Sequence, residues 1–126
     1  MALNHIGINI ADTHEIQYFY EDILEFVPEN NFPVPLEISQ QFFGIDSKTD
    51  AHIVQSEDLL LELFVYDKPL NTGYAHLCLE VKNREKIARK CIENGYPVMR
   101  KEREKGDLLF VKDKAGNVFE LKNKRI

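Results

Sequence analysis

Two histidines and two glutamates recur at matching places in the two halves of this chain of 126 residues. His5 begins one alternating apolar stretch and Glu62 lies near the end of another, and His76 and Glu120 repeat the arrangement further along. Imidazole nitrogens and carboxylate oxygens bind borderline divalent metals, and two water molecules would complete six-coordination. The pattern therefore predicts a site for one divalent ion (Ni, Zn, Co, Mn or Fe), provided that the two copies face each other.

The composition indicates a globular domain without a basic surface. With 44% hydrophobic and 29% charged residues and a net charge of -5, we expect no nucleic-acid partner. No stretch approaches the ~20 apolar residues of a membrane span, and the N-terminus has no signal-peptide pattern, so a cytoplasmic protein without a membrane partner is expected. Cys78 and Cys91 lack a CxxC spacing and are expected to be reduced core residues.

The elements that would position the first pair begin with a strand over residues 3–10. Its alternation turns His5 away from the face that carries the isoleucines. Asp12 can cap a following helix, because Glu15 completes a capping box and apolar residues then recur at i, i+3, i+4 and i+7. A strand followed by an amphipathic helix is therefore predicted.

The segment 26–50 is interrupted by prolines and a glycine, so a short strand and an ordered loop are expected there. Residues 51–56 and 59–66 then predict an antiparallel hairpin, with Glu62 on one face of its second strand. Three phenylalanines in or near the loop could form an apolar lid or fill the core of the first half; they are Phe32, Phe42 and Phe43.

The same order of elements begins again at residue 74. A strand over 74–81 has the parity of the first one, and Asn83 can cap a second helix that ends at Gly95. Ile87 and Cys91, with Ala88 and Ile92, are expected to face inward from this helix. Three strands follow, at 98–103, 108–113 and 117–122. The chain is therefore predicted to be a duplicated βαβββ unit with internal pseudo-symmetry.

The motifs LNHIGI, QYFYEDILEF, LELFVY, GYAHLCLEV and DKAGNVFEL cover most of the chain. On these motifs the sequence resembles the vicinal oxygen chelate superfamily, of the glyoxalase, bleomycin-resistance and dioxygenase type. The resemblance implies one α+β domain over residues 1–126, made of module 1 (1–67) and module 2 (73–126), with curved mixed sheets around a cup. It also implies that His5, Glu62, His76 and Glu120 hold a metal there.

Glyoxalase I is the member whose metal-ligand pattern matches best, and it implies a lyase or isomerase. Such an enzyme moves a proton next to a metal-chelated carbonyl, with Glu120 or Glu62 as the catalytic base. The use of glutathione stays open, because Asn9 stands where the bacterial enzyme has an arginine and Tyr66 where an asparagine is expected. Extradiol dioxygenases and fosfomycin-resistance enzymes use two histidines and one glutamate, so Glu62 argues against both.

Two other functions remain as alternatives. One is an acyl-CoA epimerase, although the methylmalonyl-CoA enzyme typically has a glutamine in place of Glu62. The other is a protein that only binds a small molecule or antibiotic, as bleomycin-resistance proteins do. Members of this size usually form homodimers, and the cup could lie within one chain or be shared between two. Four residues are candidates for contacts with a small-molecule substrate: His52, Phe64, Tyr66 and Phe110.

Overall fold

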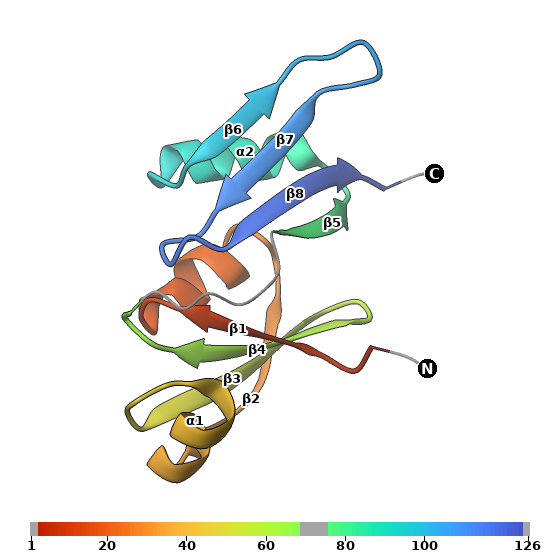
Figure 1. Cartoon of the computed structure of the whole chain (residues 1–126). Coiled ribbons are helices and arrows are strands. Elements are labelled where there is room, and N and C mark those ends of the chain that lie inside the picture. The colour runs from red at the N-terminus through yellow and green to blue at the C-terminus, as the bar shows by residue number, and fades with distance from the viewer. Residues whose placement is uncertain (1–2, 69–75, 125–126) are drawn as a thin grey trace. The chain divides into compact units, whose positions relative to one another are not determined.

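The computed structural model describes residues 3–68 and 76–124, and the chain divides into two compact units, Met1–Asn71 and Thr72–Ile126 (Figure 1). Each unit contains a four-stranded mixed sheet in which one pair of neighbouring strands is parallel and two pairs are antiparallel. Along the chain each unit has a strand, a helix and three further strands, and the first unit has one additional helix. The α+β class and the two βαβββ units predicted from the sequence are confirmed.

The sheet of the first unit has the strand order β1-β4-β3-β2. β1 runs parallel to β4, β4 and β3 form an antiparallel hairpin, and β3 pairs antiparallel with β2. Period-2 alternation separates two faces of this sheet, of which one carries Leu61 and Leu63 and the other carries Glu62 and Phe64. The strands are β1 (Ile6–Ile10), β2 (Val27–Val34), β3 (Thr49–Ser56) and β4 (Leu59–Val65).

The main core of the first unit is formed by the Leu61 face and the helix η1 (Ile16–Glu21). The predicted cap is confirmed, because the Asp12 carboxylate accepts a hydrogen bond from the Glu15 amide at 3.1 Å. The helix is π-helical, with i to i-5 bonds such as that from the Leu24 amide to the Phe19 carbonyl at 3.0 Å. The core side chains are Ile8, Ile10, Phe19, Tyr20, Ile23, Val54, Leu61 and Leu63.

The expectation of a short strand and a loop over residues 26–50 is wrong. β2 extends over eight residues, because it is an edge strand and its prolines interrupt no bond to a second neighbour. Helix α1 (Leu36–Phe43) then follows directly after Pro35 and ends at Gly44, which has φ 68°. The proline and the glycine that indicated a loop are in fact the two ends of this helix.

Helix α1 covers part of the Glu62 face of the first unit. The ring of Phe43 contacts that of Phe64 with centroids 4.7 Å apart, and the buried hydroxyl of Ser39 donates to the Ser47 carbonyl at 2.7 Å. The helix still exposes most of its apolar side chains, and Phe42 is 68% exposed. Beneath the helix lies a second buried cluster, composed of Val34, Ile45, Ala51, Phe64 and Tyr66.

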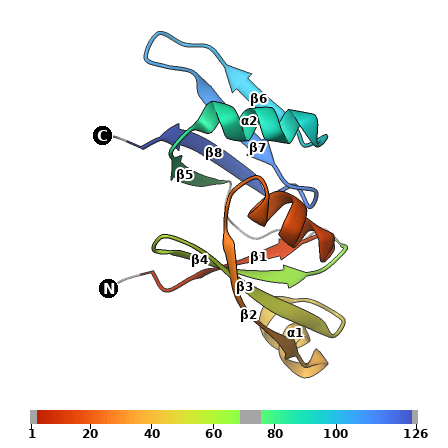
Figure 2. The same ribbon diagram turned by 180° about the vertical axis from the view of Figure 1, so that it is seen from behind.

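The second unit has the strand order β5-β8-β7-β6, and Figure 2 shows α2 (Arg84–Glu93) lying across one face of this sheet. The predicted cap and terminator are confirmed, since the Asn83 side chain accepts from the Lys86 amide at 3.1 Å and Gly95 has φ 79°. Ile92 was expected to face inward and is instead 66% exposed, because it lies off the buried stripe of the helix. The strands are β5 (Leu77–Val81), β6 (Val98–Lys101), β7 (Leu108–Lys112) and β8 (Val118–Asn123).

The two cysteines differ in environment, so the expectation that both are core residues is wrong for one of them. Cys91 is buried in α2, whereas Cys78 is exposed on the face of β5 that is not covered by the helix. No helix within residues 3–68 or 76–124 combines the length and apolar character that a membrane span requires.

Candidate metal centre

The first histidine–glutamate pair lies at β1, an edge strand of the sheet in the first unit. β1 pairs with β4 so that Gly7 is opposite Glu62, and His5 stands two residues before Gly7 and therefore on the same face. His5 Nε2 lies 3.1 Å from Glu62 Oε2. The imidazole is 44% exposed and the carboxylate 14%, so solvent reaches the ring while the carboxylate is mostly buried.

The second pair repeats this geometry in the other unit. β5 runs parallel to β8 with Cys78 opposite Glu120, and His76 stands two residues before Cys78. His76 Nε2 lies 3.2 Å from Glu120 Oε1, with exposed fractions of 39% and 14%. The two pairs thus share their strand stagger, the ring nitrogen involved, the distance and the exposure of both side chains.

The distances suit two ligands of one metal ion. Bonds of about 2.1 Å place neighbouring ligands about 3.0 Å apart in an octahedral site and about 3.4 Å apart in a tetrahedral one. The observed N···O separations of 3.1 and 3.2 Å fall in this range. Within residues 3–68 and 76–124, however, no group of three or more His, Cys, Asp and Glu side chains is close enough to hold an ion. The four predicted ligands are therefore found as two pairs, one within each unit.

The two imidazole rings are held by different neighbours. His5 Nδ1 forms a hydrogen bond with the Asn4 side-chain oxygen at 2.8 Å. The His76 ring instead meets the edge of Phe110, with centroids 5.4 Å apart. Sequence reasoning missed Asn4, although a polar residue directly before a candidate ligand in LNHIGI was a usable signal. It did select Phe110, which the structure places beside His76.

The hydrogen bond between His5 and Asn4 favours a cation at the first pair. A neutral imidazole carries only one N–H, so a His5 ring that donates from Nδ1 turns the lone pair of Nε2 toward the Glu62 carboxylate. Such a contact between two electron-rich atoms is stabilised when a cation binds to both. At the second pair, Lys122 Nζ lies 3.9 Å from Glu120 Oε2 and would compete with a metal ion for this carboxylate. The donor set of imidazole nitrogens and carboxylate oxygens thus fits a borderline divalent ion.

Phe64 supports the first pair from the same face of the sheet. It is two residues from Glu62 on β4 and is buried against α1. A Cβ atom added at Gly7 would lie 3.3 Å from Cε2 of Phe64, which explains why a glycine faces the ring there. Phe64 therefore forms an apolar wall beside the carboxylate, with the half-exposed Phe43 continuing that wall.

Tyr66 makes a polar contact within its own unit. Its hydroxyl donates to Asp46 Oδ1 at 2.9 Å, and Lys68 Nζ lies 3.4 Å from Asp46 Oδ2. The hydrogen bond from Tyr66, together with the Lys68 ammonium, holds the pKa of the Asp46 carboxyl below its usual value. The same hydrogen bond raises the pKa of the Tyr66 phenol. The phenol therefore stays neutral and donates to a carboxylate near the end of β4.

His52 lies on the other face of the first sheet. It pairs with Leu63, whereas its neighbour Ile53 pairs with Glu62. Its Nε2 is buried without a hydrogen-bond partner in the described part of the chain. The side chain therefore lies on the Leu61 face, opposite the face that carries Glu62 and Phe64.

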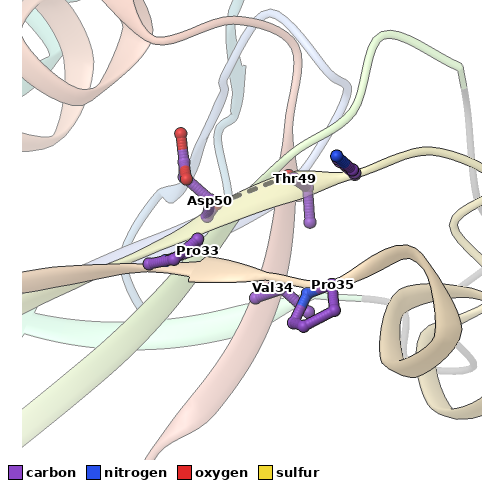
Figure 3. Close-up of a pocket in the computed structure, with 6 residues that line it drawn as sticks. Pro33, Val34, Pro35, Thr49 and Asp50 are labelled. Atoms are coloured by element: carbon purple, nitrogen blue, oxygen red, sulfur yellow. Dashed lines mark hydrogen bonds between the residues drawn. The ribbon is translucent and has the colours of Figure 1, made fainter.

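A hollow of about 370 Å³ lies elsewhere in the first unit, at the junction of β2, α1 and β3 (Figure 3). Glu62 pairs with Ile53 on β3, and Ile53 pairs with Asn30 on β2. Both of these residues lie away from the strand positions that line the hollow, so the hollow is separated from Glu62. Its polar side chains offer one carboxylate and no histidine. The hollow therefore adds nothing to the candidate metal centre; its lining residues are Pro33, Val34, Pro35, Lys48, Thr49 and Asp50.

Comparison with known families assigns the chain to a class. The sequence profile of the Glyoxalase/Bleomycin resistance protein/Dioxygenase superfamily matches residues 2–121. The chain therefore belongs to this superfamily, and the resemblance found in the sequence is confirmed. A comparison with curated protein sequences gave no match.

Solved structures show the same fold at low sequence identity. A glyoxalase family protein from Enterococcus faecalis is 20% identical, with a TM-score of 0.69 and coverage of 95% of both chains. The fosfomycin resistance protein FosX from Listeria monocytogenes is 13% identical, with a TM-score of 0.73 and coverage of 100% of this chain and 95% of that one. A mutant of that FosX, in complex with Mn(II) and 1S,2S-dihydroxypropylphosphonic acid, is 15% identical, with a TM-score of 0.75 and coverage of 99% and 94%. These likenesses establish the fold and leave the activity to be inferred from the site.

Proposed function

We propose that this chain is a metal-dependent enzyme of the glyoxalase type, a lyase or isomerase that moves a proton next to a carbonyl group of a small molecule. The observation that carries the proposal is the pair of equivalent His–Glu contacts, which match in atom, distance and exposure. Superfamily membership supports it, and so does the Mn(II) bound by a FosX mutant of the same fold. Fold alone would not distinguish an enzyme from a binding protein.

The proposed ligands are His5 and His76 through Nε2, and Glu62 and Glu120 through a carboxylate oxygen. Both carboxylates are mostly shielded from water, and burying them in one site without a cation would be costly. Bound there, a divalent ion would act as a Lewis acid toward an oxygen of the substrate. Nickel, cobalt, manganese, iron and zinc all suit this donor set.

The glutamates are the proposed bases. Either Glu120 or Glu62 would accept a proton from a hydroxyl-bearing carbon next to the carbonyl and return it to the carbonyl carbon; the hydroxyl proton would pass to the former carbonyl oxygen, which leaves an isomer of the substrate. Apolar side chains stand beside both, with Phe110 at the His76 pair and Phe64 at the His5 pair. These rings would exclude water from the reacting carbon and provide contact area for the substrate.

Glutamine substitutions test the proposed bases. The purified protein would be screened with small hydroxycarbonyl compounds and thioesters, with and without added metal, for exchange of a substrate C–H with deuterated solvent by NMR. We expect metal-dependent exchange that falls about 100-fold or more in Glu120→Gln or in Glu62→Gln. The matched control is Glu80→Gln, which changes an exposed carboxylate on β5 and should leave exchange unchanged. Normal exchange in both ligand variants, or ligand binding without metal and without exchange, would contradict the proposal.

A homodimer is the proposed assembly, with each site formed within one chain or shared between two. Mixing the variants His5→Ala and His76→Ala decides between these arrangements. If each site combines the first unit of one chain with the second unit of its partner, the mixed dimer regains one intact set of four ligands. If each site lies within one chain, no mixture restores metal binding.

A further inference from the structure

Asn4 engages the outer ring nitrogen of His5, and within residues 3–68 and 76–124 no other proposed histidine ligand has such a partner. Its Oδ1 lies 2.8 Å from His5 Nδ1, while His5 Nε2 lies 3.1 Å from Glu62 Oε2. An amide oxygen accepts hydrogen bonds only, so His5 Nδ1 must carry the proton in this contact. The Nε2 atom of a neutral ring is then left with its lone pair, which is the form that binds a metal.

We propose that Asn4 is a positioning residue that fixes His5 as the tautomer protonated at Nδ1 and directs Nε2 to the metal. The inference rests on the proposed function, because it assigns Asn4 a role at the same site. Histidine ligands commonly donate their second N–H to an oxygen acceptor, which sets both the tautomer and the ring orientation. In the first unit the adjacent side chain supplies that acceptor.

The two units fix their histidines in different ways. His76 follows Ala75 in the sequence, and its ring is placed by the edge of Phe110 at 5.4 Å. His5 is the more exposed of the two rings and has Asn4 as its hydrogen-bond partner. Removal of the amide should therefore affect His5 and leave the His76 ring unchanged.

The test uses Asn4→Ala, which removes the acceptor, and Asn4→Asp, which keeps an oxygen at the same place. Asn94→Ala is the matched control, because Asn94 also makes one exposed side-chain hydrogen bond, to the Lys90 carbonyl at 2.7 Å in the second unit. Two quantities are measured on the full chain. The ring tautomer of His5 is read without metal from long-range ¹H–¹⁵N NMR spectra at a pH where imidazole is neutral, and Zn²⁺ affinity is measured by titration calorimetry.

We expect the wild-type ring to be protonated at Nδ1 and that of Asn4→Ala at Nε2, where it would donate to Glu62. Zn²⁺ affinity should fall about 10-fold in Asn4→Ala and be retained in Asn4→Asp. An unchanged tautomer in Asn4→Ala, with Zn²⁺ affinity equal to that of the Asn94→Ala control, would overturn the role of Asn4.

The two readouts separate this inference from the metal site itself. If the wild-type chain binds no Zn²⁺, the proposed metal site fails, and the tautomer of the metal-free ring still decides whether Asn4 sets it. If Zn²⁺ binds tightly and Asn4→Ala changes neither readout, the metal site stands and the inference about Asn4 is wrong.

Discussion

The contact between α1 and the Glu62 face predicts a graded loss of stability in three Phe→Ala variants. Phe64 is 4% exposed and belongs to the cluster beneath the helix, Phe43 is 43% exposed and stacks on it, and Phe42 is 68% exposed. Phe42 and Phe43 belong to α1, and Phe64 belongs to the strand beneath it. The order of the three losses in stability therefore reports whether α1 packs on this face.

The magnitudes follow from burial. Removing a buried phenylalanine ring costs about 3–5 kcal/mol, and we expect about 3 kcal/mol for Phe64→Ala because α1 can settle into part of the space. Phe43→Ala loses an aromatic contact of about 0.5–1.5 kcal/mol and about half of the burial of its ring, which together give about 2 kcal/mol. Phe42→Ala should cost about 0.5–1 kcal/mol, since the residue is 68% exposed and only the remainder of its burial is lost.

Urea unfolding followed by circular dichroism measures these differences, with equal m-values as the sign that the three variants unfold comparably. The expected order of destabilisation is Phe64, Phe43, Phe42. Equal losses for Phe43→Ala and Phe42→Ala would show that α1 does not rest on Phe64. A loss below about 1 kcal/mol for Phe64→Ala would refute the buried cluster beside Glu62.

Three further predictions concern single groups. Asn83→Ala should lower the free energy of unfolding by about 1 kcal/mol, because the Lys86 amide loses its cap, and thermal unfolding would detect it. Tyr66→Phe should raise the pKa of Asp46 toward its ordinary value, which an NMR titration would measure. Because the pKa of Asp46 is lowered in the folded state, the carboxylate stabilises the fold above its unfolded-state pKa, and this stabilisation is lost as pH falls. The variant lacks part of this stabilisation and should therefore lose less stability on acidification. An aromatic disulfide reagent should label only Cys78 in the folded chain, because Cys91 is buried and that burial raises the pKa of its thiol to about 11. Labelling of both thiols at equal rates would contradict this prediction.

Much of the fold could be predicted because period-2 and period-3.6 patterns are strong wherever one face is buried. This holds for β4, β5 and α2, whose polar and apolar sides are clearly separated. Helix α1 escaped prediction for a physical reason. It buries Ser39 and exposes most of its apolar residues, so its pattern carries no signal of the face that packs on the sheet.

The site was predictable in part. Parity placed each glutamate on the face opposite the main core, but parity alone did not show that the ring nitrogens meet the carboxylates within each unit. The position of His52 could have been derived, since a two-residue link at 57–58 pairs Ser56 with Leu59 and therefore His52 with Leu63. The hydrogen bond that His5 donates to Asn4 joins neighbours in the chain, and no periodicity reports such a contact.

The proposed function requires that the two His–Glu pairs hold one metal ion. The most direct test is the metal content of protein purified without chelator or affinity-tag nickel, beside the variants His5→Ala and His76→Ala. We expect one divalent ion per chain, lost in either variant although the two histidines belong to different units. No metal after incubation with nickel, cobalt, manganese and zinc, or retention of the ion in one of the variants, would contradict it.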